Sequence, residues 1–446
     1  MHVDTFVQVA LTGVPLRSLA RSYAEWMLGH TDERHRVGRL KLGIPRSWTP
    51  EQVMAGEVIV KLKDVDDAAD VGRAHGLALG ERGYKDAFVI MRGNAGNEHA
   101  NANSLRGDSR VEYAEPNYLR QPDAIDSRLW AFYNPGGLNM KFTKGQSSGQ
   151  FIPGSYASTG DADEDNVENY AAGGTSVVIG SIDTGVRLTH VQLAGRVIAG
   201  RDWYNNDNDP TDDNGHGTHT SGTMAGNTVG VAGVAGAASK VTVHVQKVCG
   251  RRGCPTSAIV NAIRAAADVP GMVAMNLSLG GGSLSQSEKD AIAYANGKNV
   301  LVIASSGNDG AGTVSCPACD PGAISVGSSN WKDERASYSN WGPGLDITAP
   351  GGQCYSNTTA EGCIYSAYHS SNTSYTFMQG TSMAAPQVTG TAAIVASVTG
   401  LRGAALRSQL EGTADDKGAN GYDTTFGNGR LNSYRAVTGS SLPSGQ

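Results

Sequence analysis

The residues most able to do chemistry in this chain are one serine, one histidine and one aspartate that lie far apart in the sequence. Ser382 lies in residues 380–386, Gly-Thr-Ser-Met-Ala-Ala-Pro, and a run rich in alanine and valine follows it. That run predicts a buried helix, at whose start free N–H groups and the helix dipole would stabilise an oxyanion. A serine in this position can also be a simple helix cap, so the motif alone leaves both roles open.

The other candidates follow predicted strands or lie among small residues. Asp183 comes directly after an apolar, strand-like segment, where an aspartate can also be only a turn former. His216 and His219 are three residues apart, but no glutamate follows His216, so the His-Glu-x-x-His zinc pattern is absent. A single imidazole base fits better. Asn308 follows another predicted strand, where its amide can donate a hydrogen bond to an oxyanion.

The elements that must position these residues form an α/β pattern. Apolar strands without alternation recur from residue 176 onwards, with helical patterns between several of them, which predicts a parallel sheet flanked by helices. The predicted strands are 176–182, 241–246, 273–277, 300–304 and 322–326, and the predicted helices are 257–267 and 285–298. Chemistry in such sheets gathers at the carboxyl ends of the strands, where Asp183 and Asn308 lie.

A second, smaller domain is predicted ahead of this sheet, at residues 56–119. Its pattern is a strand at 57–63, a helix at 65–79, a strand at 86–91 and an extended segment at 110–118. So few residues give a marginal core, so we expect this α+β unit to pack on something larger.

In this order, the motifs resemble those of the subtilisin-like serine peptidases, or subtilases. The matching segments are Asp-Thr-Gly-Val at 183–186, His-Gly-Thr-His at 216–219, Ser-Leu-Gly-Gly at 278–281, Gly-Asn at 307–308 and the motif at 380–386. The order aspartate, histidine, serine is that of the subtilisin triad. Residues 56–118 are similar to the family's inhibitory propeptide. The resemblance implies a subtilisin-like parallel β-sheet flanked by helices, preceded by a small α+β propeptide domain.

The resemblance also implies a role for each candidate. Ser382 would attack the peptide carbonyl, and His216 would take its proton and return it to the leaving amine. Asp183 would hold the imidazole and stabilise its charge. Asn308 and the Ser382 N–H would bind the oxyanion. This chemistry needs no catalytic cofactor.

Substrate-binding residues follow from the same resemblance. They are Ser278, Leu279, Gly280, Gly281 and Gly307. The first four resemble the strand that pairs with an extended peptide backbone in this family. Since backbone pairing reads little sequence, selectivity must come from pockets. The three glycines leave room for a side chain, so we expect large apolar or aromatic residues before the cut.

The loop at residues 201–213 is dense in oxygen-bearing side chains. The spacing of four of them resembles a calcium loop of thermitase-like subtilases and implies a structural Ca²⁺ ion. These residues are Asp202, Asp207, Asp209 and Thr211. A solvated acidic loop is the alternative.

Six cysteines, all beyond residue 248, fall into three close pairs. Six cysteines allow 15 connectivities, and pairing between neighbours is the simplest. The neighbouring pairs are Cys249–Cys254, Cys316–Cys319 and Cys354–Cys363. The first would stiffen a lip of the cleft. Disulfides imply an oxidising compartment, so we expect secretion, although residues 1–50 show no clear export signal. Cys316-Pro-Ala-Cys319 lacks the second CxxC of a zinc site.

Composition limits the possible partners. The 446 residues allow two or three domains, and a formal net charge of −6 gives no reason to expect nucleic acid. No apolar run reaches the roughly 18 residues of a membrane span. We expect a monomeric, secreted endopeptidase that is made as a self-processed precursor, acts on peptides and proteins, and is inhibited by its own propeptide. A catalytically dead peptide-binding relative and an intracellular processing enzyme are the alternatives.

The chain divides into five predicted parts. These are an N-terminal extension of unclear role at 1–50, the propeptide at 51–121, a linker and arm at 122–170, the catalytic domain at 171–440 and a tail at 441–446. We place the processing point near residues 121–124.

Overall fold

A computed structural model of the chain describes residues 53–122, 138–141, 150–153, 174–227, 233–235, 240–354 and 362–439. The predicted extension at 1–50, most of the linker at 122–170, residues 123–124 of the processing point and the tail at 441–446 lie outside the described residues. Within the described ranges, no helix has both the length and the apolar character needed to cross a membrane.

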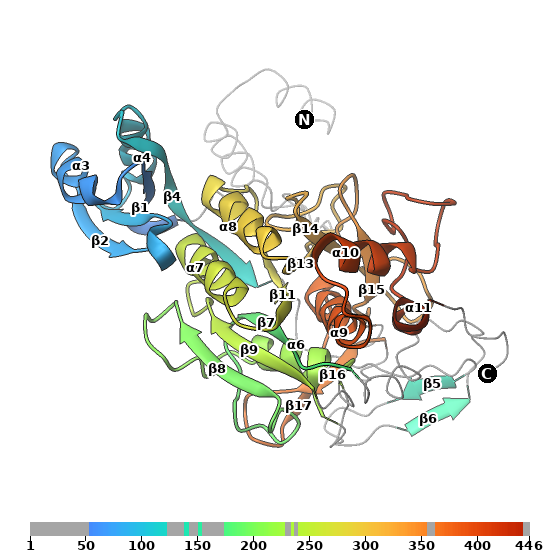
Figure 1. The fold of residues 1–446 in the computed structure, drawn as a ribbon. Helices are drawn as coiled ribbons and strands as arrows, with labels where there is room; N and C mark the ends of the chain where they lie inside the picture. The colour runs from blue at the N-terminus through green and yellow to red at the C-terminus, as the bar shows by residue number, and fades with distance from the viewer. Residues whose placement is uncertain are drawn as a thin grey trace, which may run out of the picture. The chain divides into compact units, whose positions relative to one another are not determined.

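The second half of the chain forms a seven-stranded sheet with the order β15-β14-β13-β11-β7-β9-β8 (Figure 1). Every pair of neighbouring strands in it is parallel. The strands are β7 (Val177–Asp183), β8 (Val197–Asp202), β9 (Val241–Lys247), β11 (Met272–Leu277), β13 (Leu301–Ser305), β14 (Ala323–Ser329) and β15 (Ile347–Pro350). The predicted α/β class is therefore confirmed.

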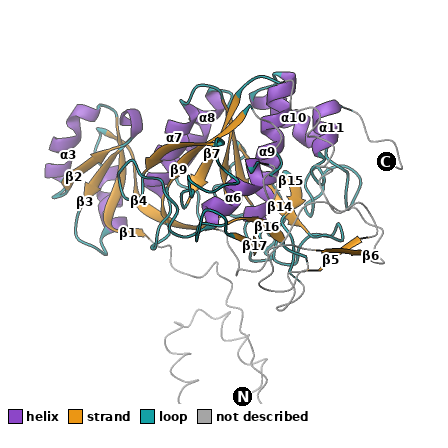
Figure 2. Cartoon of the chain, turned by 90° about the horizontal axis from the view of Figure 1, so that it is seen from below, coloured by secondary structure: helices purple, strands orange, loops and turns teal. Residues whose placement is uncertain are grey.

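The inner strands of this sheet are covered on both faces, which is why a strand such as β13 is continuously apolar rather than alternating, whereas the edge strand β8 is partly exposed. In β13, Leu301 and Ile303 pack with α9 on one face, whereas Val302 and Ala304 pack with α7 and α8 on the other. Figure 2 shows the strands between these two groups of helices. The helices are α6 (His216–Ala225), α7 (Thr256–Ala267), α8 (Gln286–Gly297), α9 (Thr381–Thr399), α10 (Gly403–Gly412) and α11 (Ser433–Thr438).

The N-terminal domain, which we define as residues 53–122, is built on an antiparallel sheet. Its elements are β1 (Val53–Leu62), α3 (Ala68–Ala74), β2 (Ala78–Arg82), β3 (Val89–Arg92), α4 (Glu98–Arg106) and β4 (Val111–Pro122), with short 3₁₀ turns at Val65–Asp67 and Tyr84–Asp86. It has a core of its own, which includes Val58, Val71 and Leu105. This is the small α+β domain predicted from the sequence.

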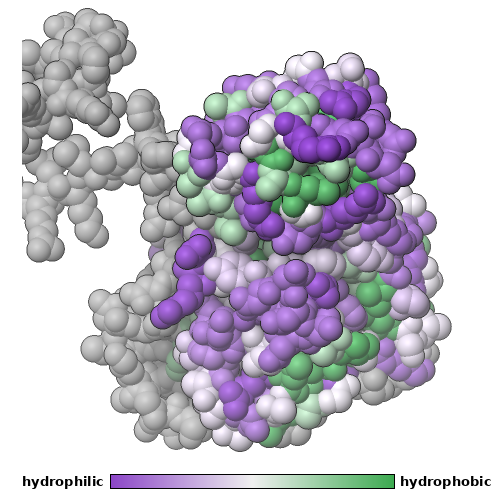
Figure 3. Space-filling model, turned by 90° about the vertical axis from the view of Figure 1, so that its left-hand side faces the viewer, coloured by the Kyte–Doolittle hydropathy of each residue, from purple (hydrophilic) through white to green (hydrophobic). Residues whose placement is uncertain are grey.

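One face of the N-terminal sheet packs on the α/β domain. Ile59, Phe88 and Ile90 are buried in the same apolar cluster as residues of α7 and α8. Hydrophilic residues predominate on the face shown in Figure 3, with hydrophobic residues in smaller patches among them. The N-terminal domain therefore buries apolar side chains in two places. One is its own core, and the other is its contact with α7 and α8.

Strand β4 belongs to both domains. Its first part pairs with β1, and in Figure 1 it then runs between α7 and α8 towards the α/β domain. Its end pairs antiparallel with two short strands, β10 (Cys254–Pro255) and β12 (Leu279–Gly280). Two further hairpins are β5 (Leu138–Lys141) with β6 (Gln150–Pro153), and β16 (Ile364–Ala367) with β17 (Tyr375–Met378).

Candidate active site

Asp183 and His216 meet at the carboxyl end of the sheet. Asp183 is the last residue of β7, and His216 is the first residue of α6. The imidazole Nδ1 lies 2.7 Å from Asp183 Oδ1, and both side chains are buried. Thr184 N and Thr220 Oγ1 also donate hydrogen bonds to the Asp183 carboxylate. An aspartate held in this way fixes the orientation of the ring and one of its tautomers.

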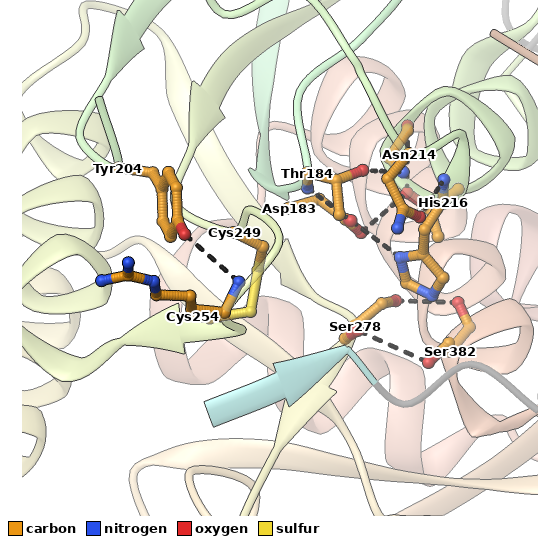
Figure 4. Close-up of a disulfide and its surroundings, with 12 residues drawn as sticks. Asp183, Thr184, Tyr204, Asn214, His216, Cys249, Cys254, Ser278 and Ser382 are labelled. Carbon is orange, nitrogen blue, oxygen red and sulfur yellow. Dashed lines mark hydrogen bonds and ion pairs between the residues drawn. A yellow bond between two sulfur atoms is a disulfide. The ribbon is translucent and has the colours of Figure 1, made fainter. Parts of the chain in front are cut away.

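Ser382 lies on the other side of the imidazole. It is the second residue of α9 and is fully buried. Figure 4 shows the His216 ring between Asp183 and Ser382, with the ring edge opposite Asp183 directed towards the serine. The structure thus brings together the three residues that the sequence places far apart.

Pro386 contributes to the setting of Ser382. A proline has no N–H, so inside a helix it leaves the carbonyl four residues earlier without its usual donor. Here that carbonyl belongs to Ser382, and Ser278 Oγ donates to it at 2.7 Å. Ser382 Oγ in turn donates to the Ser278 carbonyl at 3.4 Å. The two serines are therefore joined across the site by reciprocal hydrogen bonds.

Asn308 lies beside the start of α9. Its Oδ1 accepts hydrogen bonds from Thr381 N at 2.9 Å and from Thr381 Oγ1 at 3.0 Å. Both contacts are accepted by the amide oxygen. They fix the orientation of the side chain and leave the Nδ2 N–H groups to act as donors elsewhere. An amide fixed by its oxygen can present its N–H groups to a negatively charged oxygen.

The predicted substrate-binding residues lie at two places. Leu279 and Gly280 form β12, which pairs with Pro122 and Gln121 of β4. Gly281 continues this edge and pairs with Cys316. Gly307 has a φ of +104°, and a Cβ there would lie 2.4 Å from both Asn340 Nδ2 and Ser315 Oγ. In the direction of a Cβ, Gly307 therefore faces the protein's own side chains, and its role in substrate binding stays a prediction.

The second edge facing β4 is β10. Cys254 pairs with Arg120 and Pro255 with Leu119, so the end of β4 runs antiparallel to both edges. An extended peptide that adds a strand in this way is held through its backbone. The α/β domain therefore has a strand-binding slot next to Ser278 and Ser382.

His219 is not a second base. It is fully buried, and burial first and the neighbouring His216 second lower its pKa to about 3. It is therefore neutral at physiological pH. No group of three or more histidines, cysteines or carboxylates within the described parts of the chain is arranged to hold a metal ion.

The predicted calcium loop is closed largely by its own hydrogen bonds. The Asp202 carboxylate is buried and accepts from the backbone N–H groups of Tyr204 and Asn205 at 2.8 Å each. The Asp209 carboxylate accepts from Thr211 N at 3.2 Å. Asp207, the remaining predicted carboxylate ligand, accepts from Asp209 N. The four residues do not converge as one ligand set, so calcium binding by them stays a prediction.

A lysine already supplies positive charge to this loop. Lys247 ends β9 and is 2% exposed. Its ammonium donates to the Thr211 carbonyl at 3.0 Å and pairs with Asp213 at 3.0 Å. Hydrogen bonds from Thr211 first, and the charge of Lys247 to a smaller extent, lower the pKa of Asp209. The Thr211 carbonyl and the Asp213 carboxylate thus contact the ammonium group of Lys247, which occupies a position that a metal cation could also take.

The three predicted disulfides are confirmed, with S–S distances of 2.00, 1.96 and 2.03 Å for Cys249–Cys254, Cys316–Cys319 and Cys354–Cys363. The first closes a turn between β9 and β10 that lies beside Asp183, because Cys249 N donates to the Asp183 carbonyl. Figure 4 shows this disulfide near Tyr204, whose hydroxyl accepts from Arg252 N.

Residues outside the cleft also join the two domains. Glu115 of β4 is buried and accepts hydrogen bonds from Gln286 N and Ser287 N at the start of α8. Asn117 accepts from Ser257 N in the first turn of α7 and donates to its hydroxyl. The N-terminal domain thus caps two helices of the α/β domain; packing of this domain on a larger one was expected, but the capping roles of Glu115 and Asn117 were not.

Comparisons with known proteins agree with this architecture. Residues 174–429 match the subtilase family, and residues 49–117 match the fervidolysin N-terminal prodomain. The chain is 35% identical over 393 residues to a thermophilic serine proteinase of Bacillus sp. (strain AK1), covering 86% of this chain and 87% of the relative. It is 38% identical over 267 residues to thermitase of Thermoactinomyces vulgaris, covering 60% and 90%.

A solved structure gives the same picture of the fold. Fervidolysin from Fervidobacterium pennivorans, described as a keratinolytic enzyme related to subtilisin, superposes with a TM-score of 0.67 at 24% identity. The match covers 88% of this chain and 62% of that one. At this identity, the similarity speaks for the fold and not for the substrate.

Proposed function

Because this chain belongs to the subtilase family and is a serine endopeptidase of the subtilisin type, we propose that Asp183, His216 and Ser382 are its catalytic triad. The observation that carries the proposal is the buried Asp183–His216 hydrogen bond of 2.7 Å, with Ser382 at the opposite edge of the ring. A serine hydroxyl is a weak nucleophile at neutral pH and needs a base in contact with it.

The proton path follows from this arrangement. Ser382 Oγ attacks the scissile carbonyl, and its proton passes to His216 Nε2 as the new C–O bond forms. The imidazolium keeps its Nδ1 proton in the hydrogen bond to Asp183, and the carboxylate, which stays unprotonated, stabilises the positive charge. The Nε2 proton then goes to the leaving amine. Water repeats the same steps to release the acyl group and restore the serine.

The oxyanion is proposed to bind between Asn308 and the start of α9. The carbonyl oxygen becomes negatively charged as Ser382 attacks, and the Asn308 amide and the Ser382 N–H can donate to it. The Thr381 contacts support this role because they hold the amide oxygen away from the donor side. Removing one such donor in subtilisin costs about 3–4 kcal/mol, and we expect a similar loss here.

We propose that substrate takes the place of the end of β4. A peptide would pair with Leu279 and Gly280 on one side and with Cys254 on the other, as β4 does. Ser278, Gly281 and Gly307 stay proposed neighbours of the bound residue before the cut. Because this pairing is made by the backbone, we expect broad specificity with a preference for large apolar side chains before the scissile bond.

We further propose that the N-terminal domain is an inhibitory propeptide and that the chain is a secreted precursor. Its β4 fills the strand-binding slot, and Glu115 and Asn117 cap α8 and α7. Three disulfides in the described residues support an oxidising compartment. After cleavage near residues 121–124, the propeptide must leave before substrate can enter. We expect the mature enzyme to be a monomer.

The experiment that tests the triad compares two serine variants. Ser382→Ala is expected to abolish peptide hydrolysis and to stay folded, whereas the exposed Ser370→Ala on the same domain is expected to keep full activity. Undiminished turnover by Ser382→Ala would overturn the triad. A wild-type protein that binds peptides without cleaving them would favour the peptide-binding alternative. A panel of peptides varied before the cut tests specificity, and acceptance of charged residues alone would refute it.

A further inference from the structure

A buried carboxylate outside the triad joins the two segments that carry Asp183 and His216. Asp212 is 5% exposed and lies four residues before His216. Its Oδ1 accepts hydrogen bonds from Thr184 Oγ1 at 2.9 Å, Asn214 N at 3.0 Å and Gly215 N at 2.9 Å. Its Oδ2 accepts from the backbone N–H of Thr218 at 2.9 Å and from the Thr218 hydroxyl.

These donors come from two separate parts of the chain. Thr184 directly follows Asp183 at the end of β7. Asn214, Gly215 and Thr218 surround His216 in the turn and the first turn of α6. Backbone N–H groups at a helix start lack partners within the helix. A carboxylate there accepts their hydrogen bonds, and its negative charge interacts favourably with the positive end of the helix dipole. One side chain therefore caps the helix of the base and also holds the residue beside the triad aspartate.

Thr184 completes the link in both directions. Its hydroxyl donates to Asp212 and accepts from Gly217 N at 2.9 Å. Its own N–H donates to Asp183 Oδ1 at 2.6 Å. A Cβ on Gly217 would lie 2.1 Å from the Gly185 carbonyl, so the helix start and the turn after β7 are in direct contact. Small changes in this network would displace the imidazole relative to Asp183.

We propose that Asp212 and Thr184 are positioning residues that hold His216 against Asp183, an inference that rests on the proposed triad. Neither residue belongs to the strands that pair with β4, so neither contacts substrate in this scheme. Their effect on the reaction passes entirely through the placement of the base. Misplacement of reacting groups by about 1 Å can cost a hundredfold in rate.

The test separates placement of the base from binding of substrate. Asp212→Asn keeps the shape of the side chain, but its amide nitrogen cannot accept the hydrogen bonds that Oδ2 accepts. We expect kcat to fall about 10- to 100-fold while KM changes less than about twofold. Asp213→Asn is the matched control, because this neighbouring carboxylate is 59% exposed and pairs with Lys247 instead. Its kcat is expected to stay at the wild-type level.

A second pair of variants tests the same link without touching the carboxylate. Thr184→Val removes the hydroxyl at nearly constant volume and is expected to lower kcat, whereas Thr184→Ser keeps the hydroxyl and is expected to restore most of it. A role in folding alone would lower the concentration of active sites, measured by titration, and leave kcat per active site unchanged.

Two results would overturn the inference. One is an unchanged kcat per active site in Asp212→Asn. The other, which applies even if that variant does not fold, is equal kcat in Thr184→Val and Thr184→Ser. Either result, together with an inactive Ser382→Ala, would leave the triad intact and remove only the positioning role. An active Ser382→Ala would instead remove both proposals.

Discussion

Removal of the Glu115 side chain should weaken inhibition by the propeptide without changing the cleft. Glu115 is 7% exposed and caps α8 through Gln286 N at 2.8 Å and Ser287 N at 3.0 Å, with a further hydrogen bond from the Ser287 hydroxyl. In Glu115→Ala, these donors lose their acceptor at a buried helix start. None of them lies on β10 or β12, so the mature enzyme should cleave peptides as before.

The size of the effect follows from these contacts. Hydrogen bonds to a charged group contribute about 1.5–3 kcal/mol, and a carboxylate at a helix start contributes up to about 2 kcal/mol. The two contributions overlap and water replaces part of the loss, so we expect a net cost of about 2–3 kcal/mol. At 1.4 kcal/mol per factor of ten, this is an inhibition constant about 30- to 150-fold weaker. Glu115→Gln keeps one acceptor and should be intermediate.

The assay measures inhibition of the mature enzyme by separately added propeptide. Any cost of folding the free propeptide is the same for wild type and Glu115→Ala, because the carboxylate of Glu115 contacts the other domain. This cost therefore cancels in the ratio of the two inhibition constants. Glu112→Ala is the matched control, since Glu112 lies in the same strand but is exposed. Inhibition by Glu115→Ala within about twofold of wild type would refute the reasoning, and equal losses in both variants would indicate a general charge effect.

Three further predictions concern the cleft edge, the acidic loop and the buried histidine. Replacing Cys249 and Cys254 together by serine should raise KM for peptides long enough to reach β10, with little change for shorter ones; equal changes for both lengths would contradict this. A chelator should lower the thermal midpoint, and an unchanged midpoint would remove the predicted calcium site of the acidic loop; Lys247→Met should lower the midpoint with or without chelator. His219 has a depressed pKa of about 3, so the unfolded chain binds its proton first as the pH falls from about 6.5. Its contribution to the free energy of unfolding should therefore be lost between about pH 6.5 and pH 3, and denaturant unfolding of His219→Gln should show a shallower pH dependence there.

Five of the seven strands of the sheet could be predicted from local sequence patterns, whereas the two edge strands, β8 and β15, were not predicted. Continuous apolar runs mark strands that are buried on both faces, and β13 was expected at 300–304 and is found at Leu301–Ser305. Helix α8 begins with a capping box between Ser285 and Glu288. A serine followed three residues later by a glutamate is visible in the sequence as a helix start. Where a hydrogen bond links near neighbours, the sequence carries the information.

The predicted length of one helix was wrong because a short turn ends the helix early. The helix expected at 65–79 ends at Ala74 in α3, and the chain then enters β2. Gly76 has a φ of +67°, and Leu77 N donates to the Gly72 carbonyl at 2.8 Å, which closes the end of the helix. The apolar pattern continued past this glycine because β2 follows at once. Gly76 was the residue in the sequence from which the end of this helix could have been predicted.

Contacts between distant segments could not be predicted residue by residue. The sequence placed Asp183 and Asn308 at strand ends, yet it gave no reason to single out Asp212 from the other acidic residues of its loop. The partners of Asp212 are backbone N–H groups and hydroxyls, which leave no pattern in the residue types. The same holds for Glu115, whose role depends on a helix start 171 positions further along the chain.

The two edges that hold β4 connect specificity to self-inhibition. If substrate and propeptide occupy the same slot between β10 and β12, any change that loosens one edge weakens the binding of both. Specificity could then not be altered without also altering latency, unless part of the propeptide's affinity comes from elsewhere. The caps of Glu115 on α8 and Asn117 on α7 are such a part, because substrate bound only in the slot does not reach them. The affinity of the propeptide can therefore be changed at these two positions while the peptide-binding edges stay the same.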